Sequence, residues 1–386
     1  MIPYGRQEID SEDVEAVLKT LRSDWLTQGP TVPKFEQIIG NYCRAKHAIA
    51  TNSATSALHI ACLALGVQKG DKIWTSPISF VASANCALYC GADVDFVDVN
   101  PITYNLCPEL LEEKLIQAKK SGDLPRVLIP VHLAGQSCDM AKIYELSQRY
   151  SFRIIEDASH AIGGQYRESP IGGCRFSDIT VFSFHPVKII TTGEGGMALT
   201  NSKKLAEKLR LLRSHGIIKD QSLLQGPIDG PWYYEQISLG YNFRMTDLQA
   251  SLGISQFKRL DSIIERRRYI ASKYDRELKT LPLITPAQSL DCRSSWHLYI
   301  VRLKLDEISR TKKEVFEFMR EQGIGVNLHY IPIYNHPYYR SLGLSDKDFP
   351  NAGQYYRQAM TIPIYPNMTE EQQALVVSAL KSSTHS

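Results

Sequence analysis

The chain has 386 residues, of which 43% are hydrophobic and 22% are charged, as in an ordinary globular protein long enough to form two cores. The net charge of +3 and the lack of a long Lys/Arg run argue against nucleic-acid binding, and the lack of a long apolar run argues against a membrane span. The acidic N-terminal segment does not resemble a secretory signal, so we expect a cytoplasmic protein with neither nucleic acid nor membrane as a partner.

The cysteines show no pattern of a disulfide framework or of a metal site. All 8 lie in apolar or helical stretches without a Cys-x-x-Cys pair, which predicts reduced thiols in the core. Cys86 and Cys90 are one helical turn apart, but no histidine is spaced to complete a zinc site with them. We therefore predict no metal.

The N-terminal region begins with a polar segment, residues 1–12, in which Tyr4 is able to reach a ligand or a neighbouring subunit; a solvated tail is the alternative. A capping pattern with acids in the first turn predicts a helix from Ser11 to Leu21. A turn-rich loop, Trp25–Pro30, follows, and a second helix is expected to begin near Pro33.

Apolar runs then alternate with helical patterns as far as residue 200. The runs predict seven strands, at Ala48–Thr51, Lys72–Ser76, Val94–Val99, Val127–Val131, Arg153–Glu156, Ile179–Phe184 and Met197–Thr200. This alternation predicts an α/β fold with a mostly parallel, doubly wound sheet. In such sheets ligands bind beyond the carboxyl ends of the strands, so the residues at these ends are the first candidates for a site.

Hydroxyl residues follow the first predicted strand, in the sequence TNSATSALH (51–59) that leads into an apolar-periodic helix. Hydroxyls and free amides at a helix N-terminus bind anions. Ser53, Thr55 and Ser56 are thus candidates for holding a phosphate, although an ordinary helix cap explains the same pattern. After the second strand, Phe80 is a candidate for stacking on a flat ring, and a core position is its alternative.

An acid and a lysine follow two later strands. Asp157 comes at the end of the buried run FRIIE (152–156), and Lys188 follows the strand VFSF (181–184) within an apolar turn. A pyridoxal phosphate (PLP) site needs a lysine for the aldehyde and an acid for the ring nitrogen. The pair Asp157 and Lys188 is consistent with such a site, with Ser183 adding a hydroxyl for the phosphate. A helix-capping Asp and an exposed loop lysine are the alternatives.

The second half of the chain begins with a helix, Lys203–Ser214, and a loop rich in Gly and Pro. Thr246 caps a long helix expected to run from about Asp247 to Leu281. Beyond it, strands are expected at His297–Leu303 and Gly325–His329, and helices at Lys312–Glu321 and Glu370–Leu380. We expect a large domain with the N-terminal arm over residues 1–245, and a linking helix with a smaller α+β domain over residues 246–386.

The set of motifs SATSALH, SFVASAN, EDASHA, SFHPVK and TGEGG, in this order, resembles the DegT/DnrJ/EryC1/StrS family of sugar aminotransferases. The resemblance covers nearly the whole chain, from WLTQGP to HYIPIYNHP. It implies PLP as cofactor and the fold type I of PLP-dependent transferases, which is aspartate aminotransferase-like and has a seven-stranded sheet. It also implies a homodimer with the active site at its interface, because Asn242 of GYNFRMTD would reach the partner's phosphate.

The closest branch of the resemblance implies transamination at C4 of a UDP-linked 4-keto-6-deoxy-N-acetylhexosamine, with L-glutamate as donor, as in pseudaminic acid biosynthesis. Lys188 and Asp157 would be catalytic, and His160 would join Phe80 and the hydroxyl residues around the cofactor. The residues expected near the substrate are Tyr4, Thr27, His185 and His329.

Three alternatives stay open at this point. The sugar can be linked to dTDP or GDP and aminated at C3 or C4. A catalytically idle PLP-binding protein with a regulatory role would share the same motifs. A nucleotide-binding oxidoreductase would share the α/β pattern, but residues 51–56 contain no glycine and hence no Gly-x-Gly-x-x-Gly run.

Overall fold

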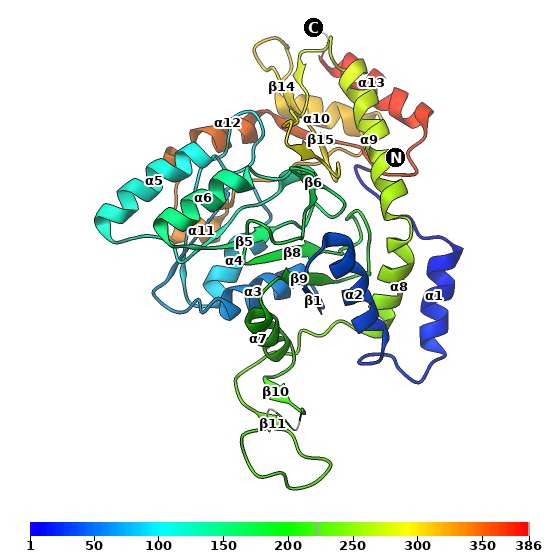
Figure 1. Cartoon of the computed structure of the whole chain (residues 1–386). Helices are drawn as coiled ribbons and strands as arrows, with labels where there is room; N and C mark the ends of the chain where they lie inside the picture. The colour runs from blue at the N-terminus through cyan, green and yellow to red at the C-terminus, as the bar shows by residue number, and fades with distance from the viewer. Residues whose placement is uncertain (221, 223, 385–386) are drawn as a thin grey trace.

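A seven-stranded sheet forms the centre of the computed structural model, which describes residues 1–220, 222 and 224–384 (Figure 1). Its strand order is β1-β9-β8-β5-β4-β2-β3. The strands are β1 (His47–Thr51), β2 (Lys72–Thr75), β3 (Asp93–Phe96), β4 (Val127–Ile129), β5 (Arg153–Asp157), β8 (Ile179–Ser183) and β9 (Gly196–Thr200). β2 pairs in parallel with β3 and β4, β4 with β5, and β5 with β8, whereas β9 runs antiparallel to both β8 and β1. The mostly parallel sheet predicted from the sequence is confirmed.

Helices cover both faces of this sheet. One face packs against α3 (Ala54–Ala64), α4 (Ala82–Tyr89) and α7 (Lys203–Arg213). The other face packs against α2 (Thr31–Cys43), α5 (Pro108–Ser121) and α6 (Met140–Tyr150). Neighbouring strand residues such as Val181 and Phe182 enter the cores on opposite faces, because successive side chains of a strand point to opposite sides. Both faces are therefore dry, and polar groups concentrate at the strand ends.

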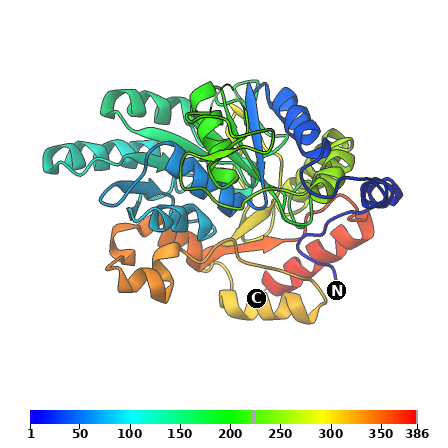
Figure 2. The ribbon, with the colours of Figure 1, turned by 90° about the horizontal axis from the view of Figure 1, so that it is seen from below.

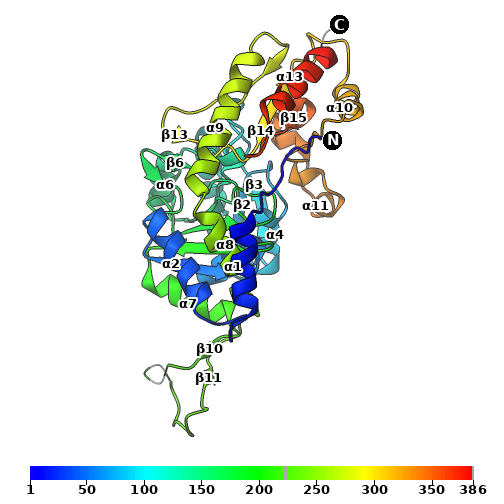
Figure 3. The ribbon, with the colours of Figure 1, turned by 90° about the vertical axis from the view of Figure 1, so that its right-hand side faces the viewer.

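The predicted long helix after residue 246 is wrong in one respect, because it is divided into α8 (Asp247–Phe257) and α9 (Leu260–Glu277). At the break the N–H of Arg259 bonds to the carbonyl of Gln256, three residues back. The guanidinium of Arg259 forms ion pairs with Glu8, Asp10 and Asp13. These contacts tie the break to the N-terminal arm and to α1 (Ser11–Leu21), which lies beside α8 (Figure 3).

The C-terminal elements gather on one side of the molecule (Figure 2). A small antiparallel sheet has the order β12-β14-β15, formed by Leu283–Ile284, Tyr299–Leu303 and Ala359–Ile362. The helices around it are α10 (Lys312–Glu321), α11 (Pro337–Ser341), α12 (Pro350–Gln358) and α13 (Glu370–Thr384). The strand predicted at Gly325–His329 is wrong. Only Asn327 forms a bridge there, to Thr361 of the unpredicted β15, which also pairs with β14, so the segment touches this sheet at one residue and not along a strand.

Three short segments complete the architecture. The N-terminal arm pairs at Ile2 with Ile324, which brings Tyr4 towards the C-terminal elements. The hairpin of β10 (Ile217–Ile218) and β11 (Glu235–Gln236) projects away from the sheet (Figure 1). A third sheet has the order β13-β6-β7, from Cys292–Arg293, Gln165–Tyr166 and Ser169–Pro170. No helix within the described residues is both long and apolar enough to cross a membrane. The domain boundary between residues 245 and 246 stays a prediction.

Candidate active site

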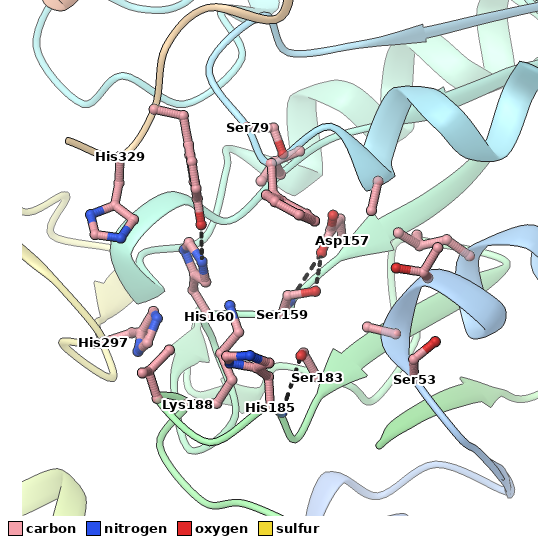
Figure 4. A pocket seen from close by; sticks show the side chains of 18 of the residues that line it. Ser53, Ser79, Asp157, Ser159, His160, Ser183, His185, Lys188, His297 and His329 are labelled. Atoms are coloured by element: carbon pink, nitrogen blue, oxygen red, sulfur yellow. Dashed lines mark hydrogen bonds between the residues drawn. The ribbon is translucent and has the colours of Figure 1, made fainter. Parts of the chain in front are cut away.

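A cavity of about 440 Å³ opens at the carboxyl ends of the parallel strands (Figure 4). It brings together residues from the start of α3, from the ends of β5 and β8, from the N-terminal arm and from the C-terminal elements. The residues singled out in the sequence that line it are Tyr4, Ser53, Thr55, Phe80, Asp157, His160, Ser183, His185, Lys188 and His329.

Asp157, the last residue of β5, is a buried carboxylate with all its hydrogen bonds donated to it. Oδ1 accepts from the N–H of Ser159 at 3.1 Å and from its hydroxyl at 2.6 Å, and Oδ2 accepts from the hydroxyl of Ser83 at 2.6 Å. Ser83 lies on α4 and is in turn 2.7 Å from Ser79. This set of donors suits an ionised carboxylate and fixes its orientation in the cavity.

Lys188 points into the same cavity from the turn after β8 (Figure 4). Burial lowers the pKa of its amine to about 8, and the charge of Asp157 acts in the opposite direction. A pKa of about 8 leaves a large fraction of the amine neutral near pH 7.5. A neutral lysine amine is the form that attacks an aldehyde.

The N-terminus of α3 forms the opposite end of the cavity. Ser53 is its N-cap, because its hydroxyl accepts from the N–H of Ser56 at 3.1 Å. The first N–H groups of a helix have no partner within the helix, so they favour an anion. Gly196 of β9 passes so close that an added Cβ would lie 2.4 Å from the backbone of Ser53 and Ala54. A glycine here lets the helix N-terminus approach the sheet.

Aromatic rings form the remaining walls. Phe80 is 59% exposed and its ring centroid lies 6.2 Å from that of Tyr330. Tyr4 lies 5.2 Å from His329, also between ring centroids, so the N-terminal arm closes one side of the cavity. Burial first, and then the charge of Lys188, lowers the pKa of His329 to about 3. His329 is therefore neutral at physiological pH.

The ring of His160 is held by two hydrogen bonds. Its Nδ1 accepts from the N–H of Ala134 at 3.2 Å, and its Nε2 lies 3.0 Å from Oη of Tyr330. Burial, followed by the charges of Lys188 and His329, lowers the pKa of His160 far below its usual value. The ring is therefore neutral and carries one proton.

Three predicted site residues lie outside this cavity. Thr27 is exposed, and its carbonyl accepts from the N–H of Asp247. The hydroxyl of Ser56 donates to Asn52 at 2.7 Å, so it supports the turn behind the helix N-terminus. Asn242 is exposed beyond the edge strand β1 and does not contact the cavity of its own chain.

Sequence analysis missed several residues of the site. Those that line the cavity are Ser79, Ser159, Glu194, His297 and Tyr330, and Ser83 contacts Asp157 from behind. Ser159 and Tyr330 each lie within two residues of a candidate that was named, which is a usable signal. His297 carried none, because it follows a loop and lies 137 residues along the chain from its neighbour His160, at 4.4 Å between ring centroids. Within the described part of the chain, no group of three or more His, Cys, Asp or Glu is arranged to hold a metal ion.

Comparison with known proteins now identifies the enzyme class. The model of the DegT/DnrJ/EryC1/StrS aminotransferase family matches residues 7–381. The chain belongs to this family. It is an aminotransferase of the PLP-dependent fold type I, which excludes the oxidoreductase alternative.

Several similar proteins are named as transaminases or sugar aminotransferases. A Campylobacter jejuni protein named UDP-4-amino-4,6-dideoxy-N-acetyl-beta-L-altrosamine transaminase is 39% identical over 383 residues, which cover 99% of this chain and 97% of that protein. Helicobacter pylori PseC, an aminotransferase involved in the biosynthesis of pseudoaminic acid, has a TM-score of 0.90 at 32% identity and covers 99% of both chains. Spr1654 from Streptococcus pneumoniae, in its PLP form, has a TM-score of 0.88 at 27% identity over 99% of this chain and 98% of that chain.

The cofactor of the family is PLP, and the residues of this cavity fit it. The cavity holds an amine with a lowered pKa, a carboxylate that accepts three hydrogen bonds and a helix N-terminus with hydroxyl groups. These are the groups that an aldehyde, a protonated ring nitrogen and a phosphate require. The flat ring would have the exposed face of Phe80 beside it.

Proposed function

We propose that this enzyme transfers the amino group of L-glutamate to C4 of a UDP-linked 4-keto-6-deoxy-N-acetylhexosamine, in the biosynthesis of a sugar of the pseudaminic acid type. The similarity to the Campylobacter jejuni altrosamine transaminase and to Helicobacter pylori PseC supports this substrate. The main structural support for transamination is that the Lys188 amine and the Asp157 carboxylate line the same cavity.

Lys188 would be the covalent anchor and the proton carrier. When bound, PLP supplies an aldehyde that takes up amino groups and a ring that accepts electrons released at the donor carbon. The Lys188 amine would hold the cofactor through its aldehyde and, when free, would take up and return the proton at Cα of the donor amino acid. The pKa of the Lys188 amine, about 8, lies near physiological pH. A group with such a pKa takes up and releases a proton readily, so it can serve as both base and acid.

Asp157 would hold the ring nitrogen in its protonated state. The carboxylate accepts hydrogen bonds from Ser83 and Ser159, which keep it aimed into the cavity. A fixed negative charge beside that nitrogen stabilises the positive charge on the ring, and so favours uptake of electrons.

The phosphate would lie at the N-terminus of α3. Ser53, Thr55 and Ser183 present hydroxyls on this side of the cavity, and the first turn of α3 adds backbone N–H groups. His185, Tyr4 and His329 line the rest of the opening, where the substrate would enter.

We also propose that the active enzyme is a homodimer. Asn242 is exposed and does not line the cavity of its own chain, so a role at a phosphate would require a second copy of the chain. An isologous interface would place Asn242 of each subunit near the cavity of the other.

The direct test is the absorption spectrum of the PLP-loaded protein before and after addition of L-glutamate. The long-wavelength band of the lysine-bound cofactor should convert to the pyridoxamine form. The UDP-linked 4-keto sugar should then restore the band. Restoration by a dTDP- or GDP-linked keto sugar and not by the UDP sugar would overturn the proposed substrate. A band that no amino acid converts would overturn the proposed transamination in favour of an idle PLP-binding protein.

A further inference from the structure

The position of one proton in the cavity is set by the protein backbone. The N–H of Ala134 can only donate, and it donates to Nδ1 of His160 at 3.2 Å. A neutral imidazole has one donor and one acceptor nitrogen. Nδ1 is therefore the acceptor, and Nε2 carries the proton and donates to Oη of Tyr330 at 3.0 Å.

This arrangement determines what the hydroxyl of Tyr330 can do. Because Oη accepts the hydrogen bond from His160, its own hydrogen has to be donated elsewhere. Within the described residues, His160 is the one hydrogen-bond partner of Oη. Tyr330 lines the cavity that also contains Lys188. Burial and the nearby charge of Asp157 raise the pKa of Tyr330, so the phenol stays protonated at physiological pH.

We propose that Tyr330 donates a hydrogen bond to an acceptor oxygen of the molecule that fills the cavity, and that Ala134 and His160 set the direction of this bond. Two oxygens of the occupants have this chemistry, the ring oxygen of the cofactor and the carbonyl oxygen of the keto sugar. An ammonium group, which can only donate, does not fit the same position. For the sugar oxygen the inference rests on the proposed function.

The direction of the bond matters for the chemistry. A donor with a fixed direction stabilises negative charge that develops on an oxygen, because the donor does not have to reorient. His160 acts through Tyr330 and is a positioning residue, whereas Tyr330 would touch the bound molecule. The rings of His160 and Tyr330 are nearly parallel at 22°, with centroids 6.0 Å apart, so ring packing supports the same geometry.

The tautomer of His160 can be measured in the protein without cofactor or substrate. In a sample labelled with ¹⁵N-histidine, Nδ1 of His160 should have the shift of an unprotonated nitrogen and Nε2 that of a protonated one. The signal is assigned by its loss in His160→Gln. A proton on Nδ1, or an imidazolium at pH 7, would overturn the proposal. This result is independent of which sugar is the substrate.

The second experiment removes the hydroxyl in Tyr330→Phe. The matched control is Tyr42→Phe, because Oη of Tyr42 donates to Asp261 on the surface, far from the cavity lining. If the acceptor is the cofactor oxygen, Tyr330→Phe should move the absorption band of the loaded protein and slow both half-reactions. If it is the sugar oxygen, the band and the glutamate half-reaction stay unchanged, and the sugar half-reaction falls about 100-fold. Wild-type behaviour in the band and in both half-reactions would refute the proposed role of Tyr330.

A pair of His160 variants tests the direction of the bond. Glutamine keeps an N–H at the position of Nε2, whereas leucine removes it. Tyr330→Phe is expected to change the absorption band or the rate of a half-reaction. His160→Gln should change the same quantity less than His160→Leu does. Equal losses in the two variants would show that His160 serves packing alone, and would overturn its positioning role. If wild type converts with glutamate but no keto sugar restores the band, the proposed substrate fails while the tautomer result stands.

Discussion

The two walls of the catalytic cavity are built in different ways. The sheet wall consists of Ser53, Asp157, Ser183 and Lys188, which lie at or just after the ends of β1, β5 and β8. The C-terminal wall consists of His297, His329 and Tyr330, which lie in loops around the small sheet.

The sheet wall depends largely on contacts that are close in sequence. Asp157 accepts from Ser159, two residues away, and Ser53 caps the helix that follows it. The topology of a parallel sheet brings these short segments to one edge.

The C-terminal wall depends on contacts between distant segments. Nδ1 of His329 lies 2.8 Å from the hydroxyl of Thr361, and Tyr355 donates to the carbonyl of His329. The guanidinium of Arg267 is buried and donates to the carbonyls of Trp296, His297 and Ile364. The reactive groups of the sheet wall are thus positioned mostly by residues nearby in the sequence. The loops of the C-terminal wall are positioned by residues that are far away in the sequence.

The largest effect is expected in the sheet wall, at Lys188. Lys188→Ala removes both the covalent anchor and the proton carrier, so the rate of the glutamate half-reaction should fall by about 10⁴-fold or more. Single-turnover absorption spectroscopy measures it. Lys203→Ala, at a side chain that is 84% exposed, is the control and should react as wild type does. A fast half-reaction in Lys188→Ala would contradict the role of this lysine.

In the C-terminal wall the largest effect is expected on stability, at Arg267. Arg267→Met leaves three buried carbonyls without their donor, and the free energy of unfolding should fall by about 2–4 kcal/mol. Denaturant unfolding measures this change. Arg276→Met, at an exposed position of the same helix α9, should change the stability by less than about 0.5 kcal/mol. Equal effects of the two substitutions would show that Arg267 does not hold this wall.

A smaller effect on stability is expected where β9 meets α3. In Gly196→Ala the added methyl group would lie 2.4 Å from the backbone of Ser53 and Ala54, so strand and helix have to separate. We expect a loss of about 1–3 kcal/mol and weaker retention of PLP, measured by unfolding and by equilibrium dialysis. Gly5→Ala is the matched control, because a methyl group there meets nothing within 4 Å. If Gly196→Ala retains PLP as well as wild type does, the contact between β9 and α3 does not contribute to the phosphate site.

The smallest effect is a change in the pKa of Lys188. Burial lowers this pKa to about 8 and the charge of Asp157 raises it, so Asp157→Asn should move the pKa below about 8. The neutral fraction of the amine at pH 7.5 should therefore increase. Competitive acetylation of the protein without cofactor, read by mass spectrometry of the Lys188 peptide, gives the midpoint. A midpoint that rises in Asp157→Asn would contradict this balance of burial and charge.

The elements of the large sheet were predictable because each is encoded in a short apolar run. All seven strands occur at or within a few residues of their expected positions. The errors lie where distant contacts decide the backbone. Arg259 lies at the break in the helix and pairs with the N-terminal segment, and the stretch expected to be a strand at Gly325–His329 meets β15 only through Asn327. In the site, Asp157 and Lys188 were found from their strand ends, whereas His297 was not found.

The α/β class, the lysine and acid of the cavity, and the family with its cofactor can all be predicted from the sequence. These properties are written in short motifs whose residues lie next to one another in the chain. The hydrogen bond from Ser83 to Asp157, that from Arg267 to the carbonyl of His297, and the contact of Nε2 of His160 with Tyr330 arise from the tertiary structure. Those contacts join residues from about 30 to 170 positions apart, and their geometry exists only after the chain has packed.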